Sequence, residues 1–225
     1  MISYHAHNEM TRAAELVIKL EQGTKVALVS DAGTPGVSDP GHRLVSLCLR
    51  HHIPVIPIPG PSAFVAALAA SGLSTDEFLF VGFLPSRAGA RRKALESLKN
   101  EPRTVVLYEA PHRLLETLAD AAVVMGPRPA VVAREITKIH EEFLRGNLLE
   151  LRDAAEKRAP RGEITLLIGP DEGGAQHVDT SVSLKQRVSQ LELESGLDRK
   201  AALKQAARER GLGKREAYKQ LLLER

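Results

Sequence analysis

Short apolar runs alternate with helical patterns along the first third of this 225-residue chain, and each run ends in a turn rich in glycine and proline. The run at 25–30 (KVALVS) leads into 31–41 (DAGTPGVSDPG), which favours neither a helix nor a strand. The run at 53–58 leads into 59–63 (PGPSA). Strands that alternate with helices are typical of a parallel α/β sheet. We therefore predict a buried strand at 25–30 and a strand at the sheet margin at 53–58. The helices predicted around them cover 9–21, 42–52 and 61–71.

The pattern changes after residue 75, because two predicted strands there follow each other without a helix between them. The predicted strands lie at 77–84, 104–108, 130–134, 141–145 and 163–168, and the predicted helices at 87–100, 111–125 and 148–158. Strands that are adjacent in sequence indicate a mixed sheet. We predict two α/β lobes, a first lobe at 1–75 and a second lobe with a mixed sheet at 76–170.

Positive charge is concentrated at the C-terminus. Residues 181–225 carry a net charge of +5, whereas residues 1–180 carry −2. The segment at 171–182 has the composition of a linker, and 183–225 shows only helical patterns. Two of its helices are joined by a turn containing glycines, which is the helix-turn-helix arrangement. This pattern favours contact with a phosphate backbone, and a docking module without nucleic acid is the alternative.

Composition narrows the class of protein. A single cysteine, Cys48, excludes a disulfide framework and a cysteine-rich zinc site. No apolar run approaches the roughly 20 residues of a membrane span, and the N-terminus lacks the pattern of a signal peptide. The cytoplasm is therefore the expected compartment. The P-loop, dinucleotide-binding and G-x-S-x-G motifs are all absent from the sequence.

Four polar loops follow predicted strands. Small residues form two of them, at 31–35 (DAGTP) and 59–63, and polar side chains fill the others, at 108–113 (YEAPHR) and 134–142. Ligands of parallel α/β sheets bind at the carboxyl ends of the strands. Each loop could instead be a structural turn or a salt-bridge cluster, but together they predict the mouth of one cleft.

Seven ordered segments carry a resemblance to a known family. They are 3–9 (SYHAHNE), 28–41 (LVSDAGTPGVSDPG), 59–63 (PGPSA), 80–85 (FVGFLP), 108–113 (YEAPHR), 134–138 (REITK) and 161–164 (RGEI). In this order they resemble the tetrapyrrole methylase family, and specifically its members that methylate a cytidine 2′-hydroxyl in 16S rRNA. The family pattern opens with a strand and a Thr-Pro-x-Gly-Asn-Leu loop that precede the first of these segments, so we expect the first lobe of this chain to lack them.

The resemblance implies a two-lobed α/β fold, a homodimer, S-adenosylmethionine in the cleft between the lobes, and 16S rRNA of the small ribosomal subunit as substrate. It implies no metal. The cofactor-binding residues that it implies are Asp31, Ala32, Gly33, Thr34, Pro35, Ser62, Ala63, Tyr108, Glu109, Glu163 and Ile164. A small-molecule methyltransferase of the same fold and a non-catalytic nucleic-acid-binding protein are the alternatives.

The methyl acceptor loses a proton during the reaction, so a polar group near the cleft is a candidate base. The candidates are Glu109, Arg113, Glu135 and Lys138, and salt-bridge roles explain them equally well. A basic cluster in the second lobe and the basic tail are the candidate RNA contacts: Arg87, Arg91, Arg92, Lys93, Arg199, Lys200, Lys204, Lys214, Arg215 and Lys219.

Overall fold

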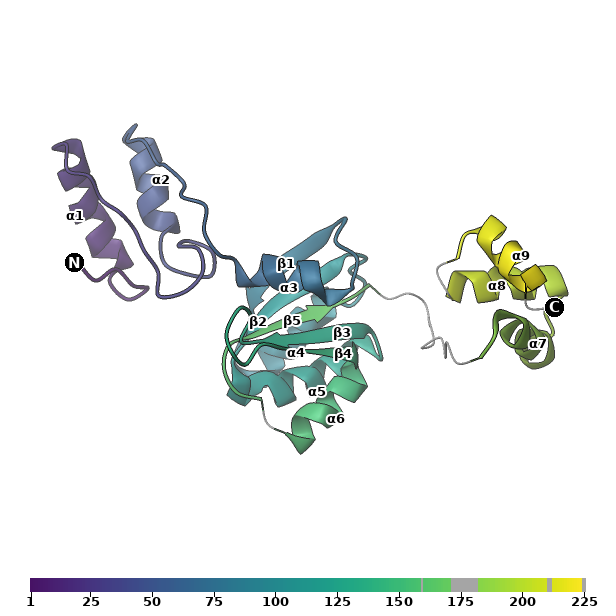
Figure 1. The fold of residues 1–225 in the computed structure, drawn as a ribbon. Coiled ribbons are helices and arrows are strands. Elements are labelled where there is room, and N and C mark those ends of the chain that lie inside the picture. The colour runs from purple at the N-terminus through teal and green to yellow at the C-terminus, as the bar shows by residue number, and fades with distance from the viewer. Residues whose placement is uncertain (159, 171–181, 210–211, 224–225) are drawn as a thin grey trace. The chain divides into compact units, whose positions relative to one another are not determined.

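A computed structural model of the chain describes residues 1–158, 160–170, 182–209 and 212–223 (Figure 1). The chain divides into two compact units, at 1–171 and 172–225. Except for its last residue, the predicted linker at 171–182 lies outside the described residues.

The first unit contains a five-stranded sheet in the order β1-β2-β5-β3-β4. Its strands are β1 (Phe78–Phe83), β2 (Thr104–Glu109), β3 (Pro129–Arg134), β4 (Glu142–Asn147) and β5 (Ile164–Ile168). β1 and β2 pair in parallel, while β2–β5, β5–β3 and β3–β4 are antiparallel. The predicted mixed sheet is therefore confirmed, with strand ends within a few residues of the predicted positions.

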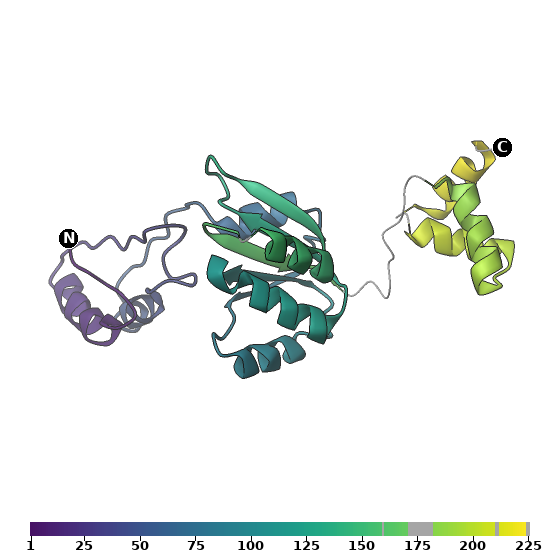
Figure 2. The same cartoon turned by 90° about the horizontal axis from the view of Figure 1, so that it is seen from below.

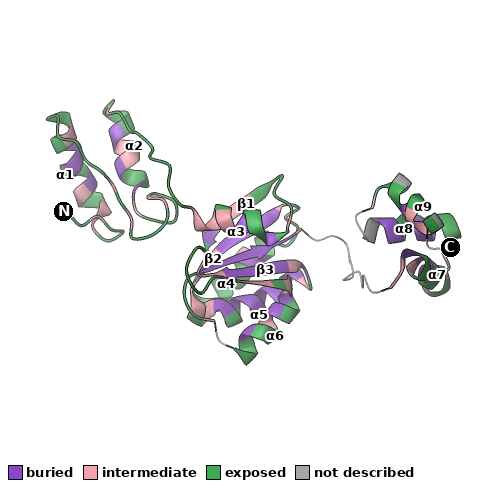
Figure 3. Ribbon diagram, viewed as in Figure 1, coloured by how far each residue is buried: buried purple, intermediate pink, exposed green. Residues whose placement is uncertain are grey.

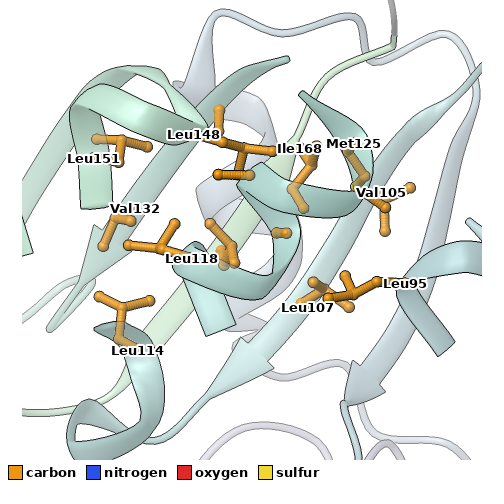
Figure 4. Close-up of a cluster of buried hydrophobic side chains, with 14 of the residues drawn as sticks. Leu95, Val105, Leu107, Leu114, Leu118, Met125, Val132, Leu148, Leu151 and Ile168 are labelled. Carbon is orange, nitrogen blue, oxygen red and sulfur yellow. The ribbon is translucent and has the colours of Figure 1, made fainter. Parts of the chain in front are cut away.

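Helices cover both faces of this sheet. α4 (Ala88–Ser97), α5 (Leu114–Met125) and α6 (Leu148–Lys157) pack on one face, and α3 (Ala63–Ser71) packs on the other (Figure 1). A short 3₁₀ turn, η1 (Pro111–Arg113), precedes α5. Because strand side chains alternate between faces, β2 sends Val105 and Leu107 into the larger core and Val106 toward α3. Figure 4 shows that larger core, where Leu118 of α5 lies among strand and helix side chains.

Two helices near the N-terminus have a core of their own. α1 (Glu9–Glu21) and α2 (His42–Arg50) lie side by side in both views (Figures 1 and 2). Their facing sides bury Ala13, Leu16, Val17, Leu44 and Cys48 (Figure 3). Glu9 of α1 also contacts the start of α2, because its Oε1 accepts a hydrogen bond from the Gly41 N–H at 3.2 Å. The same oxygen accepts a hydrogen bond from the Tyr4 hydroxyl at 3.2 Å.

The strands predicted at 25–30 and 53–58 are wrong. Both segments lack strand structure, and most of their apolar side chains are exposed, with Val29 at 76% and Ile56 at 77%, while Leu28 and Ile53 are half-buried. A strand is stable when a neighbouring strand pairs with its N–H and C=O groups, and neither segment pairs with a strand in the part of the chain that the structure describes. α3 was predicted as part of the first lobe, but it packs on one face of the sheet that follows it in the sequence.

The second unit is a bundle of α7 (Leu184–Ser195), α8 (Arg199–Glu209) and α9 (Lys214–Leu223). Leu184, Val188 and Leu191 pack against Ala202 and Ala206 in a core that is separate from the sheet. A capping box of Ser183 and Gln186 begins α7. Asp198 precedes α8, and its side chain accepts a hydrogen bond from the N–H of Ala201 in the first turn at 2.7 Å. The all-helical tail is thus confirmed. Among the described residues, no helix is both long and apolar enough to cross a membrane.

Candidate functional site

Polar segments from separate parts of the sequence meet at one edge of the sheet. Register pairs place Phe83 of β1 beside Tyr108, Glu109 beside Ile164 of β5, and Ile164 beside Arg134 of β3. The carboxyl ends of β1, β2 and β3 and the start of β5 therefore share this edge, which we call the site edge. Of the four loops predicted to form one mouth, those at 108–113 and 134–142 follow β2 and β3 and are brought to this edge by the strand directions. The loops at 31–35 and 59–63 follow no strand of this sheet.

The two loops of small residues contact each other near the start of α3. The Thr34 hydroxyl donates a hydrogen bond to the Pro61 carbonyl at 3.0 Å across 27 residues of sequence. Gly33 has φ +71°, and a Cβ added there would meet nothing within 4 Å. Asp31, Ala32 and Gly33 are exposed. This turn thus has the backbone freedom and the open space that a bound ligand would need.

Tyr108 lies near the end of β2 and contacts the start of α3. Its ring packs edge-on against Phe80 at a centroid distance of 5.2 Å, and Phe80 stacks on Phe64 of α3 at 4.4 Å. Burial raises the pKa of Tyr108, as does the nearby carboxylate of Asp39, while the Phe64 N–H lowers it. The tyrosine therefore lies at the first turn of α3, beside the predicted Ser62 and Ala63. Asp39 and Phe64 were not predicted, although Asp39 is part of the segment at 28–41.

Glu109 points away from its neighbour Tyr108, because successive strand residues face opposite sides of the sheet. It is only 3% exposed. Its Oε2 accepts from the Thr117 hydroxyl at 2.6 Å and its Oε1 from the Ala110 N–H at 2.8 Å. The Arg113 Nε lies 3.4 Å from the same Oε1. These contacts join the end of β2 to η1 and α5.

Arg113 also connects β1 to this group. Its Nη2 donates to the Leu84 carbonyl at 2.8 Å and to the Pro85 carbonyl at 3.1 Å. The loop after β1 is thereby fixed against the end of β2. The polar contacts of both candidate catalytic residues, Glu109 and Arg113, are made within the protein.

Glu135 and Lys138 form an ionic cluster with Glu163. The Lys138 Nζ lies 3.2 Å from Glu135 Oε1 and 3.1 Å from Glu163 Oε2, and the Glu163 N–H donates to Glu135 Oε1 at 2.9 Å. The Glu163 N–H and Lys138 lower the pKa of Glu135. Hydrogen bonds to Glu163 and Glu135 raise the pKa of Lys138, so its amine is protonated at neutral pH. Ile164, predicted beside Glu163, buries its side chain in the larger core and offers only its backbone to the site edge.

The predicted RNA contacts differ in exposure. Arg91 is 2% exposed, and its guanidinium lies 2.8 Å from Asp120 and 3.2 Å from Glu116. Arg92 is exposed and also pairs with Asp120, at 2.7 Å. The remaining exposed members of the set are Arg87, Lys93, Arg199, Lys200, Lys204 and Lys219. The side chains of Lys214 and Arg215 lie outside the described part of the structure.

Comparison with known proteins assigns the chain to a family. The sequence profile of the Tetrapyrrole (Corrin/Porphyrin) Methylases matches residues 2–152. The chain is 46% identical over 205 residues to "Ribosomal RNA small subunit methyltransferase I" of Synechocystis sp., covering 91% of this chain and 73% of that protein. The protein of the same name from Micromonospora olivasterospora is 45% identical, covering 89% and 64%. The relatives are longer than the 225-residue chain, which spans about two thirds to three quarters of their length.

Solved structures agree on the fold. The methyltransferase CobJ matches with a TM-score of 0.55 at 22% identity, covering 71% of this chain and 70% of that one. Uroporphyrin-III-C-methyltransferase from Thermus thermophilus matches with a TM-score of 0.52, also at 22% identity, covering 73% of each chain. The solved structures share the fold, and the sequence profile with the two relatives shows that the chain belongs to the tetrapyrrole methylase family, in the branch whose curated members are named ribosomal RNA small subunit methyltransferase I.

Proposed function

We propose that this protein transfers a methyl group from S-adenosylmethionine to the 2′-hydroxyl of a cytidine in 16S rRNA of the small ribosomal subunit. The observation that carries this proposal is the 46% identity over 91% of the chain to a relative named for small-subunit rRNA methylation. Such a substrate would place the protein in the cytoplasm. The homodimer that the resemblance implies is part of the same proposal.

The residues of the first unit fit S-adenosylmethionine, which supplies an electrophilic methyl group when bound. The turn at 31–35 offers open space at Gly33, and Asp31 adds an exposed carboxylate to it. The first turn of α3 offers backbone N–H groups next to Ser62 and Ala63, which favour a negatively charged group. Tyr108 adds a ring that is fixed by Phe80. We infer that these three segments bind the cofactor.

Positioning of the ribose is expected to provide most of the rate enhancement. Lys138 is protonated, since its pKa is raised, and it cannot act as a general base. Tyr108 is also protonated at neutral pH, because its pKa is raised. The carboxylates of Glu109 and Glu135 already accept hydrogen bonds within the protein. We therefore infer that the four candidate catalytic residues orient the loops of the site edge, and that water accepts the hydroxyl proton.

The test is transfer of labelled methyl from S-adenosylmethionine to small ribosomal subunits isolated from cells that lack this methylation. Gly33→Ala is expected to weaken binding of the cofactor by at least tenfold in calorimetry, because its Cβ would enter the open space of the turn. Gly23→Ala is a matched control, since Gly23 also has a positive φ, +86°, and no atom within 4 Å of an added Cβ. Absence of transfer to subunits by the unaltered protein would contradict the proposed substrate. Equal cofactor affinity of the two variants would contradict the proposed cofactor site.

A further inference from the structure

The basic residues near the site edge fall into two groups. Arg91, Arg113, Arg134 and Lys138 each pair with a carboxylate of the first unit. Arg87 and Arg161 are exposed, and neither has an acidic partner among the residues that the structure describes. A guanidinium without a carboxylate partner keeps its donors available for an anion. Close to the end of β2, these two arginines are therefore available to an anionic partner.

Backbone contacts fix the segments that carry the two unpaired arginines. Arg113 donates to the carbonyls of Leu84 and Pro85, and Arg91 Nη1 donates to the Ser86 carbonyl at 3.4 Å, directly before Arg87. On the other segment, Arg134 Nη1 donates to the Arg161 carbonyl at 3.3 Å. In both cases a paired arginine holds the backbone beside an unpaired one. Because these segments are already ordered before binding, less conformational entropy is lost when a ligand binds.

The positions of Arg87 and Arg161 flank the strand that carries Tyr108. Arg87 lies between the end of β1 and the start of α4, and Arg161 lies just before β5. β2 separates β1 from β5 in the sheet. Since neighbouring strands are about 4.8 Å apart, the two segments leave the sheet roughly 10 Å from each other, on either side of the end of β2.

We propose that Arg87 and Arg161 bind two phosphates of the RNA strand, one on each side of the nucleotide presented at the end of β2. The planar guanidinium donates two parallel hydrogen bonds to a phosphate, which gives both charge and orientation. This inference rests on the proposed function, because it needs an RNA substrate. It adds Arg161, which the basic cluster in the sequence did not contain, and it excludes Arg91, whose guanidinium is buried among carboxylates.

The same helix supplies a matched control. Lys99 follows the C-terminal end of α4, whereas Arg87 precedes its N-terminal end, and both side chains are exposed. α4 connects the end of β1 to the start of β2, so Lys99 lies at the opposite edge of the sheet. A general attraction between a basic surface and RNA would involve both residues, and a defined pair of phosphate contacts would involve only Arg87.

The experiment measures the affinity of the full chain for small ribosomal subunits over a range of KCl concentrations. The slope of log affinity against log KCl concentration is negative, and its magnitude reports the number of phosphate contacts. Arg87→Gln and Arg161→Gln are each expected to lower this magnitude by about 0.7 to 0.9, and the double variant by about twice that amount. Lys99→Gln should leave the slope unchanged. All of these variants should bind S-adenosylmethionine as the unaltered protein does, which separates loss of RNA contact from misfolding.

The outcomes distinguish this inference from the proposed function. Equal changes for Lys99→Gln and Arg87→Gln would show diffuse attraction and overturn the pair of contacts. Unchanged slopes for both arginine variants, in a protein that still methylates subunits, would overturn the inference and leave the proposed function intact. Absence of subunit binding and methylation by the unaltered protein would overturn both.

Discussion

Residues 1–62 and residues 63–170 show similar apolar runs in the sequence but differ in structure. In the second region every predicted strand is present, and its backbone pairs with a neighbouring strand. In the first region the apolar runs at 25–30 and 53–58 are mostly exposed and pair with no strand among the described residues, and the buried side chains lie between α1 and α2. An apolar run therefore specifies a strand only where a partner strand is available.

The two regions also differ in how their loops are fixed. Thr34 donates one hydrogen bond from the turn at 31–35 to the Pro61 carbonyl. At the site edge, Glu109, Arg113, Glu135 and Lys138 fix the loops through several ion pairs and hydrogen bonds. We therefore expect substitutions in the second region to affect stability most, and substitutions in the turn at 31–35 to affect ligand binding most.

The largest expected effect is loss of a core side chain in the second region. Leu118 of α5 is fully buried within the larger core (Figure 4), so Leu118→Ala should lower the free energy of unfolding by about 2–5 kcal/mol. Ile56→Ala in the first region should change it by less than about 0.5 kcal/mol, because Ile56 is exposed. Urea denaturation monitored by circular dichroism measures both. Equal losses would show that Ile56 contributes to a core and that the two regions do not differ in this way.

The sequence predicted most of the second region for a physical reason. Its strands are apolar runs whose partners belong to the same chain, so the local pattern and the pairing agree. The sequence also predicted that the loops at 108–113 and 134–142 share an edge, because strand direction determines where loops emerge. The same reasoning failed for the loops at 31–35 and 59–63, since the strands predicted before them are absent. It could have predicted that Tyr108 and Glu109 face opposite sides, since that follows from strand alternation alone.

Charge pairing was not predictable in the same way. Arg87 and Arg91 are one helical turn apart and look equivalent in the sequence, yet Arg87 is exposed and Arg91 is buried. The difference depends on Asp120, which is 29 residues from Arg91 in sequence and contacts it only when α4 and α5 pack together. Tertiary contacts of this kind determine which basic residues remain available to a partner.

The second prediction concerns that buried pair. Arg91→Gln should destabilise the protein by about 2–3 kcal/mol, somewhat less than the ~3–5 kcal/mol typical of a fully unpaired buried charge, because Arg92 remains beside Asp120. Lys93→Gln on the same helix is the control and should change stability by less than about 0.5 kcal/mol, since Lys93 is exposed. Thermal and urea unfolding measure both variants. A stability loss at Lys93 equal to that at Arg91 would contradict the structural role of the pair.

The third prediction compares a glycine from each region. A Cβ at Gly162, where φ is +86°, would overlap the carboxylate of Glu135, whereas a Cβ at Gly33 meets nothing. Gly162→Ala should therefore cost about 2 kcal/mol, from backbone strain and displacement of Glu135, and Gly33→Ala only about 1 kcal/mol from strain. Affinity for S-adenosylmethionine should instead fall more in Gly33→Ala than in Gly162→Ala. If Gly33→Ala were the more destabilising variant, the turn at 31–35 would have packing that the structure does not show.

The smallest expected effect is a pH dependence confined to the first region. Burial acts to raise the pKa of Glu9, but hydrogen bonds from Gly41, Tyr4 and Arg43 outweigh it, so the pKa lies below its usual value of 4.5. The ionised carboxylate therefore stabilises the α1–α2 pair, and this contribution is lost as pH falls through the lowered pKa. Methyl NMR signals of Leu16 and Val17 should shift as the pH falls below 4.5 while those of Leu118 stay constant, because the two cores are separate clusters. Glu9→Gln should remove this difference, since the amide does not titrate. Simultaneous shifts at Leu16 and Leu118 would mean that the two cores unfold as one cooperative unit, and that their separation in the structure does not extend to their stability.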